Sequence, residues 1–103
     1  MMYTLSYLPS AQLDIRAIRA YMENEKYPAS IQKKIISQIR DRIAKLADMP
    51  KMHPISQDDA RFRRIVVGSY LVFYTLDEEV HQVEVHHIWH GMMNIQEKLS
   101  KSK

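Results

Sequence analysis

The chain has 103 residues, and its 15 Lys and Arg against 12 Asp and Glu give a formal net charge of +3. This length has room for a single domain, residues 1–103. The absence of cysteine excludes disulfides, thiolate nucleophiles and cysteine-based zinc sites, and two glycines argue against a Gly-rich phosphate loop. No apolar run reaches the roughly 20 residues of a membrane span, and the N-terminus lacks the order of a signal peptide, so we expect a cytoplasmic protein without a membrane partner.

The first element along the chain is a predicted strand. Residues 2–8 alternate in the manner of a β-strand, and we expect this strand at the edge of a sheet. From Ala11 to about Asn24 the apolar residues then recur at steps of three and four, which predicts a helix. Ser10 is placed to cap that helix.

A second helix is predicted to start at Pro28 or Ser30 and to end at Met49-Pro50, because the residue before a proline is disfavoured in a helix. Its expected buried stripe consists of Ile31, Ile35, Ile39, Ile43 and Leu46. After a loop over residues 50–60 the spacing of apolar residues changes from helical to alternating.

Three β-prone runs follow, and their short separations predict an antiparallel meander. They cover residues 61–67, 70–76 and 81–89. A short helix or tail over residues 94–103 is expected to begin with a capping box of Asn94 and Glu97. The order β-α-α-β-β-β(-α) predicts an α+β fold in which a helical hairpin covers one face of a small, mostly antiparallel four-stranded sheet and leaves the other face free.

The positive charge is unevenly distributed. Residues 26–51 hold seven cations and two acids, and Arg61, Arg63 and Arg64 form a second basic cluster. Basic surfaces attract polyanions, so this pattern suits nucleic acid or an acidic protein. The alternative for the second helix is an ordinary solvated face.

The histidines do not predict a metal site. His86 and His87 are neighbours in a strand, so we expect them to point to opposite faces, with His87 on the side of Val83, Val85 and Trp89. No metal and no cofactor is expected. His90 lies where the last strand ends, and the sequence leaves both a structural and a functional role open for it.

In general acid-base cleavage of RNA, the nucleophile is the 2′-hydroxyl of the RNA itself. The enzyme then has to supply only a base, an acid and cations that stabilise the phosphorane. The chain offers side chains of these types at Lys51, His53, Arg64, Tyr70, Tyr74 and His90. The two tyrosines are spaced evenly with Val72, so packing in the sheet is the alternative role for both.

The segments RFRRIVVGSYLVFYTLDEEV and VEVHHIWHGMMNIQEKL, after an N-terminal Tyr-x-Leu-x-Tyr strand, resemble the RelE/ParE superfamily of bacterial type II toxins over residues 3–99. The resemblance implies the same β-α-α-β-β-β fold and a growth inhibitor neutralised by a cognate acidic antitoxin, with operator DNA reached only through that complex. The expected partner-binding residues are Lys33, Lys34, Arg40, Met92 and Met93.

Two modes of action divide this superfamily: RelE-like members cut mRNA on the ribosome, whereas ParE-like members poison DNA gyrase. Leu71, Gly91, Met92 and Met93 stand where the nucleases often carry cations, and these departures favour the ParE-like mode. A RelE-like endoribonuclease and a degenerate toxin that only binds antitoxin stay open. The candidate catalytic residues are Lys51, His53, Arg64, Tyr74 and His90, and the candidate anion-binding residues are Lys51, Arg61, Arg63 and Arg64.

Overall fold

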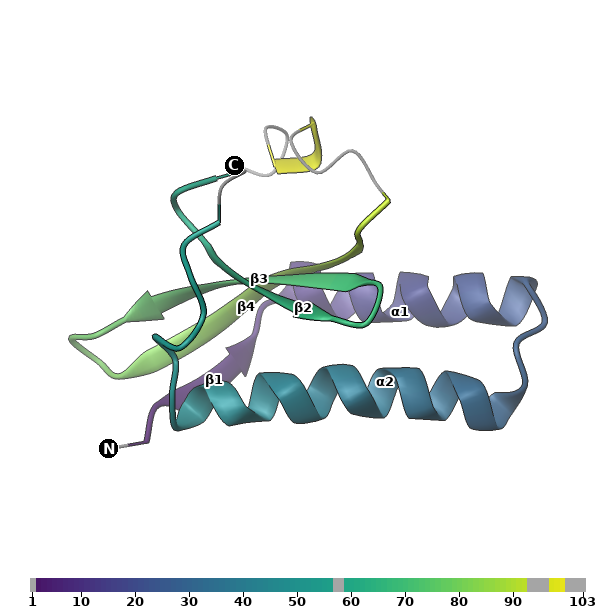
Figure 1. The fold of residues 1–103 in the computed structure, drawn as a ribbon, viewed down its shortest axis with the longest axis horizontal. Coiled ribbons are helices and arrows are strands. Elements are labelled where there is room, and N and C mark those ends of the chain that lie inside the picture. The colour runs from purple at the N-terminus through teal and green to yellow at the C-terminus, as the bar shows by residue number, and fades with distance from the viewer. Residues whose placement is uncertain (1, 57–58, 93–96, 100–103) are drawn as a thin grey trace.

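The computed structural model describes residues 2–56, 59–92 and 97–99, which form a four-stranded sheet and two long helices (Figure 1). The elements are β1 (Thr4–Tyr7), α1 (Pro9–Asn24), α2 (Ala29–Ala44), the 3-10 turn η1 (Lys45–Ala47), β2 (Arg63–Val67), β3 (Tyr70–Asp77) and β4 (Gln82–His90). The sheet order is β1-β4-β3-β2, with β1 parallel to β4 and the other pairs antiparallel. The predicted fold, the meander and the edge position of the first strand are confirmed. Neither described helix is both long and apolar enough to span a bilayer.

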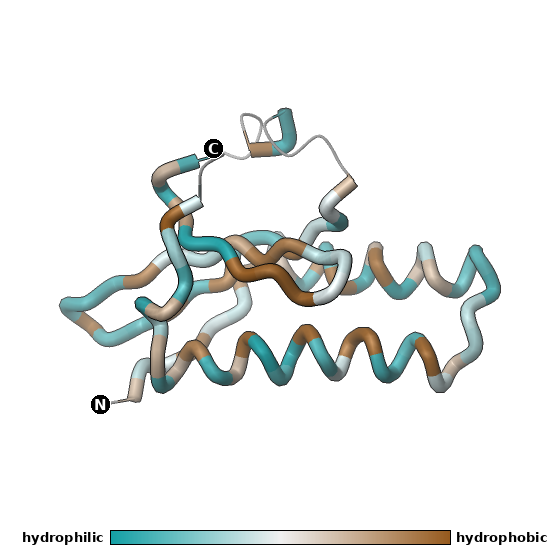
Figure 2. Tube along the Cα trace, in the orientation of Figure 1, coloured by the Kyte–Doolittle hydropathy of each residue, from teal (hydrophilic) through white to brown (hydrophobic). Residues whose placement is uncertain are grey.

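Both helices pack their apolar stripes on the same face of the sheet. Figure 2 shows hydrophobic positions recurring along each helix. In this main core Ile15 and Met22 of α1 and Ile39 of α2 lie with Val72 and Val83 of the sheet, all of them buried. Burying each such side chain contributes about 1.5–3 kcal/mol, so this layer dominates the stability of the domain.

The second helix differs from its prediction in two respects. Helix α2 ends at Ala44, earlier than the predicted Met49-Pro50, and the chain continues through the tighter turn η1. Ile31 was predicted to be buried but is 43% exposed, whereas Ile36 is only 6% exposed and belongs to the core. The helix is therefore rotated so that its contact with the sheet is centred between Ile36, Ile39 and Ile43.

Ser10 does not cap α1. The helix begins at Pro9, which sits in the first turn where its missing N–H has no cost, and Leu8 is the residue that precedes the helix. The Ser10 hydroxyl instead donates a hydrogen bond of 2.7 Å to the carbonyl of His86 in β4. The prediction of a cap was wrong because a partner distant in the sequence takes the hydroxyl.

Beyond the end of β1, helix α1 packs along the edge of β4. Strand β1 pairs with residues 82–85 only, so the rest of β4 presents unpaired backbone groups on that side. The Leu8 N–H donates to the Val85 carbonyl at 3.0 Å, and the Asp14 carboxylate accepts the Ile88 N–H at 3.0 Å. With the Ser10 bond, these contacts replace a neighbouring strand and satisfy groups that would otherwise be costly to bury.

The opposite face of the sheet is partly covered. Phe62, Phe73, Trp89 and Leu99 form a second core there, beneath the loop before β2 and the helical residues 97–99. The prediction of a free face was therefore wrong at this end of the sheet, because apolar side chains of β3 and β4 point to both sides. Glu97 of the predicted terminal helix is described as helical, whereas its expected cap Asn94 lies outside the described residues.

We predict that Asp14→Ala lowers the free energy of unfolding by about 1–3 kcal/mol, since it leaves the Ile88 N–H without an acceptor. Urea unfolding followed by circular dichroism measures the change. Asp41→Ala, which removes an exposed carboxylate near the C-terminal end of α2, is the matched control and should change stability by less than about 0.5 kcal/mol. Equal effects of the two variants would contradict the role of Asp14 at the strand edge.

Candidate functional site

A β-bulge at His86 determines which side chains of β4 face the helices. Phe73 pairs with His87 and Tyr74 pairs with Val85, so His86 has no Cα partner in β3 and the alternation of β4 reverses there. Val83 and Val85 lie in the main core, whereas Trp89 lies in the second core.

The two adjacent histidines consequently share one face. The ring centroids of His86 and His87 lie 6.4 Å apart, and Phe62 packs edge-on against both rings. The predictions that the two point to opposite faces, and that His87 lies with Val83 and Val85, are therefore wrong. His87 is buried and stacks on Trp89 with a centroid distance of 4.2 Å.

Both imidazoles have structural contacts. His86 Nε2 lies 2.9 Å from the Thr75 hydroxyl, and His87 Nδ1 lies 3.6 Å from the Asp14 carboxylate. Burial lowers the pKa of His86 below its ordinary value of 6.5, which favours the neutral ring. In the described parts of the chain no three His, Asp or Glu side chains are grouped closely enough to hold a metal ion.

The three arginines of the predicted cluster do not converge. Arg61 Nε donates to the Asp59 carboxylate at 2.9 Å, within the loop before β2. Arg63 pairs with Tyr74 on the helix-facing side of the sheet and donates a bond of 2.8 Å to the carbonyl of His53. Arg64 pairs with Phe73, on the face of the second core. The structure therefore divides these cations between a loop and two faces.

Tyr74 is a core residue. Its ring is fully buried, its hydroxyl donates a bond of 2.6 Å to the carbonyl of Pro50, and burial raises its pKa to about 12. This placement gives no support to proton exchange by Tyr74.

Two further catalytic candidates lie in the loop that precedes β2. Lys51 forms an exposed ion pair with Glu78 of the β3–β4 turn, and the hydrogen bond that Lys51 donates to this carboxylate raises the pKa of Lys51. Burial lowers the pKa of His53. The backbone carbonyl of His53 accepts a hydrogen bond from Arg63. Lys51 therefore already has an anionic partner.

His90 lines a groove of ≈ 550 Å³ between α1 and the end of β4. We call it the apolar groove. Its walls include Ile18, Tyr21, Tyr70, His90, Met92 and Lys98. The His90 ring packs edge-on against Tyr70 at 5.4 Å, and its Nδ1 accepts the Met92 N–H at 3.1 Å. Tyr70, the partner of His90 in β3, packs against the main core, whereas Arg64 pairs with Phe73 of the second core, so His90 and Arg64 lie on opposite faces of the sheet.

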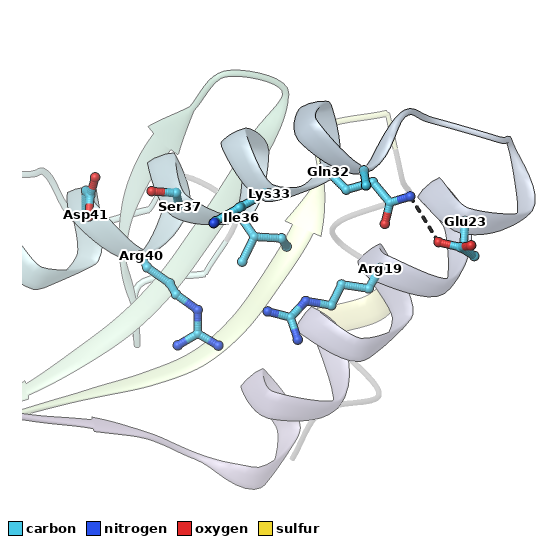
Figure 3. Close-up of a pocket in the computed structure, with 9 residues that line it drawn as sticks. Arg19, Glu23, Gln32, Lys33, Ile36, Ser37, Arg40 and Asp41 are labelled. Atoms are coloured by element: carbon cyan, nitrogen blue, oxygen red, sulfur yellow. Dashed lines mark hydrogen bonds between the residues drawn. The ribbon is translucent and has the colours of Figure 1, made fainter.

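A second groove, of ≈ 470 Å³, lies between α1 and α2 (Figure 3). We call it the basic groove; it is lined by Arg19, Glu23, Lys33, Ile36, Arg40 and Asp41, among others. Of the predicted partner-binding residues, Lys33 and Arg40 lie here, Lys34 is exposed on α2, and Met92 lines the apolar groove. Met93 lies outside the described residues. Arg19 was not among the residues predicted from the sequence, although its spacing of three from Arg16 places both on one side of α1.

Residues 5–95 match the family model of the ParE toxin of the type II toxin-antitoxin system, parDE. The chain is a member of the ParE toxin family. The resemblance predicted from the sequence is thereby confirmed at the level of the superfamily. No curated protein sequence matches the chain significantly.

Solved structures of the superfamily share the fold of this ParE family member. The chromosomal ParDE system from P. aeruginosa is similar with a TM-score of 0.74 at 13% identity, over 86% of this chain and 96% of that chain. A RelE toxin mutant of E. coli in the free state is similar with a TM-score of 0.64 at 16% sequence identity, over 99% of this chain and 95% of that chain. The RelBE2 toxin-antitoxin complex of Mycobacterium tuberculosis is similar with a TM-score of 0.59 at 20% sequence identity, over 87% of this chain and 92% of that chain.

We predict that His86→Gln reduces the pH dependence of stability. Because burial favours the neutral ring, the unfolded chain binds more protons than the folded chain as the pH falls below 6.5, and the free energy of unfolding decreases there. The variant should show a smaller loss than the wild type between about pH 7.5 and about pH 5.5 in urea unfolding. The depressed pKa of His53 leaves part of the slope in place.

The control for this measurement is His81→Gln, which changes the same residue type in the turn before β4, outside the second core. A slope in His86→Gln as steep as that of the wild type would contradict the assignment of the pH dependence to the second core.

Proposed function

We propose that this ParE family member is a growth-inhibiting toxin of a type II toxin-antitoxin system that acts by binding DNA gyrase rather than by cutting RNA. The observation that carries the proposal is the separation of the groups that acid-base cleavage would need. Arg64 and His90 lie on opposite faces of the sheet, and the Tyr74 hydroxyl is buried against a backbone carbonyl.

RNA cleavage requires a base and an acid within about 2.6–3.2 Å of the protons that they transfer, together with cations at the phosphorane. Loss of one charge-stabilising donor costs about 3–4 kcal/mol of transition-state stabilisation in comparable sites. This chain carries Leu71, Gly91 and Met92 where nucleases of the superfamily often carry cations. Lys51, His53, Arg63 and Tyr74 lie near one another around the loop before β2, but the Tyr74 hydroxyl is bound to the Pro50 carbonyl and Lys51 is paired with Glu78. Arg64 and His90 lie elsewhere, on opposite faces of the sheet. This distribution supports a function carried out by binding.

Exposed apolar side chains support a binding function as well. Val66 on β2 is 53% exposed and Met92 after β4 is 88% exposed. Met92 adjoins the apolar groove, whose walls include Tyr21 and Tyr70. Aromatic residues and methionine are enriched in protein interfaces, and an apolar groove of this kind is typical of a surface that contacts another protein.

The proposed regulator is a cognate antitoxin. The P. aeruginosa and M. tuberculosis relatives are toxin-antitoxin systems, and the positive charge of this chain suits an acidic protein partner. We place the protein in the bacterial cytoplasm, where both partners would be synthesised.

Induction of the isolated protein in bacteria, with pulse labelling of DNA and protein synthesis, tests this function. We expect DNA synthesis to stop first, with filamentation, DNA damage and intact mRNA, and inhibition of purified gyrase in a supercoiling assay. An immediate halt of translation with fragmented mRNA would favour the RelE-like mode instead. Unimpaired growth at confirmed soluble expression would identify a degenerate toxin that only binds antitoxin.

We predict that Arg64→Ala leaves growth inhibition within about twofold of the wild type. A nuclease that used Arg64 for charge stabilisation would lose activity by roughly 10²-fold or more. Colony counts after induction, normalised to the amount of soluble protein, measure the effect. A loss of that size, with a wild-type melting temperature, would contradict the gyrase mode.

A further inference from the structure

The last residues of β4 have an open edge on the side away from β3. On this edge the Asp14 carboxylate accepts a hydrogen bond from the Ile88 N–H. On the other edge the Gly91 N–H donates a hydrogen bond of 2.8 Å to the carbonyl of Ser69, just before β3. The backbone groups of successive residues in an antiparallel strand point alternately to one edge and to the other. The Ile88 carbonyl and both backbone groups of His90 therefore point to the open edge.

These three backbone groups are available to a partner. Within the part of the chain that the structure describes, no hydrogen bond satisfies them. Strand β1 ends opposite Val85, so no described strand lies beside residues 88–90 on this edge. An unpaired stretch of sheet edge is a template to which an extended chain adds.

The apolar groove runs along this open edge. Residues 88–90 all line it, although successive side chains of a strand point to opposite faces, so the edge of the strand itself forms one wall. Ala17, Ile18 and Tyr21 of α1 form the opposite wall. The volume of ≈ 550 Å³ accommodates side chains of a docked segment beside the strand edge.

The side chains around the groove favour an apolar partner that carries an acidic residue. Tyr21 and Tyr70 border the groove with large aromatic rings. The Asp14 carboxylate already accepts a backbone hydrogen bond of β4, whereas the Lys98 ammonium lies 5.0 Å from the centre of the Trp89 ring. A docked helix would leave the three backbone groups of β4 unpaired, and a nucleic-acid backbone does not match walls that are mostly apolar.

We propose that the apolar groove docks an extended apolar segment of the target protein, which adds to the open edge of β4 as a further short strand. The backbone of the segment pairs with the Ile88 carbonyl and with the N–H and carbonyl of His90. Every second side chain of the segment enters the groove, and an acidic residue reaches Lys98. This inference rests on the proposed function, because it takes gyrase as the protein that supplies the segment.

The test uses the full chain and a defined probe, a fluorescein-labelled peptide of about seven residues in which valine alternates with threonine and glutamate. Two matched peptides carry N-methyl groups, one on the valine amides and the other on the amides of the residues between them. Fluorescence anisotropy measures affinity, and NMR shifts of the ¹⁵N-labelled chain locate the peptide. Strand addition uses only one edge of the peptide, so we expect one methylated peptide to bind about tenfold more weakly and the other to keep its affinity within about threefold.

Two substitutions on α1 separate the groove from the rest of the helix surface. Ala17 and Ala20 are both exposed, and Ala17 lines the groove whereas Ala20 does not. Ala17→Trp fills the groove and should weaken peptide binding about tenfold or more, whereas Ala20→Trp should change it less than twofold. Because both positions are exposed, the variants should fold, and circular dichroism checks this.

The same variants connect the groove to the target. In a supercoiling assay with purified gyrase, Ala17→Trp should inhibit about tenfold more weakly than the wild type, and Ala20→Trp should inhibit equally well. Full inhibition by Ala17→Trp would overturn the assignment of the groove to the target while the proposed function stands. A wild type that does not inhibit gyrase would contradict the proposed function, and with it the source of the segment.

Three further results would overturn strand addition at β4: no peptide binding to the wild type, equal losses for the two methylated peptides, or NMR shifts centred on Val66 of β2 rather than on His90. Sedimentation of the protein alone as a dimer that Ala17→Trp dissociates would assign the groove to a second copy of the chain instead.

Discussion

The contact between α1 and the unpaired edge of β4 is the constraint on which the rest of the structure depends. The Asp14 carboxylate accepts a hydrogen bond from the Ile88 N–H and also lies 3.6 Å from His87 Nδ1. One side chain of α1 therefore contacts both the backbone and a side chain of β4. Because the helix axis is fixed at this edge, Ile15 is directed into the main core and Arg19 is left on the outside. The edge contact therefore sets both the packing and the wall of the basic groove.

Local signals were sufficient to predict the elements and the fold. Alternation and the Gly68-Ser69 turn predicted the β2–β3 hairpin, because both act within a few residues of the chain. The bulge at His86 was not predictable in this way, since it depends on the pairing of β3 with β4. A single extra residue then reversed the faces expected for the residues that follow it, including Trp89.

The candidate site was predicted less well, because neighbours in the sequence are not neighbours in space. Arg63 and Arg64 are adjacent, yet alternation along β2 places them on opposite faces. The converse holds for Arg19 and Arg40, which belong to different helices and meet only after the hairpin has packed. The pattern of each helix predicts its own apolar stripe but not its rotation against the other, which is why Ile36 was missed as the floor of the groove.

The parallel pairing of β1 with β4 joins the first strand of the chain to the last one and delays completion of the sheet during synthesis. Residues 4–7 complete the sheet only when residues 82–85 are present, so the N-terminal strand must wait for the last strand to leave the ribosome. Until then the chain lacks β4, one of the two central strands of its sheet, and the apolar stripes of the helices lack part of the surface on which they pack. The complete sheet therefore forms only at the end of translation, when β4 becomes available to pair with both β1 and β3.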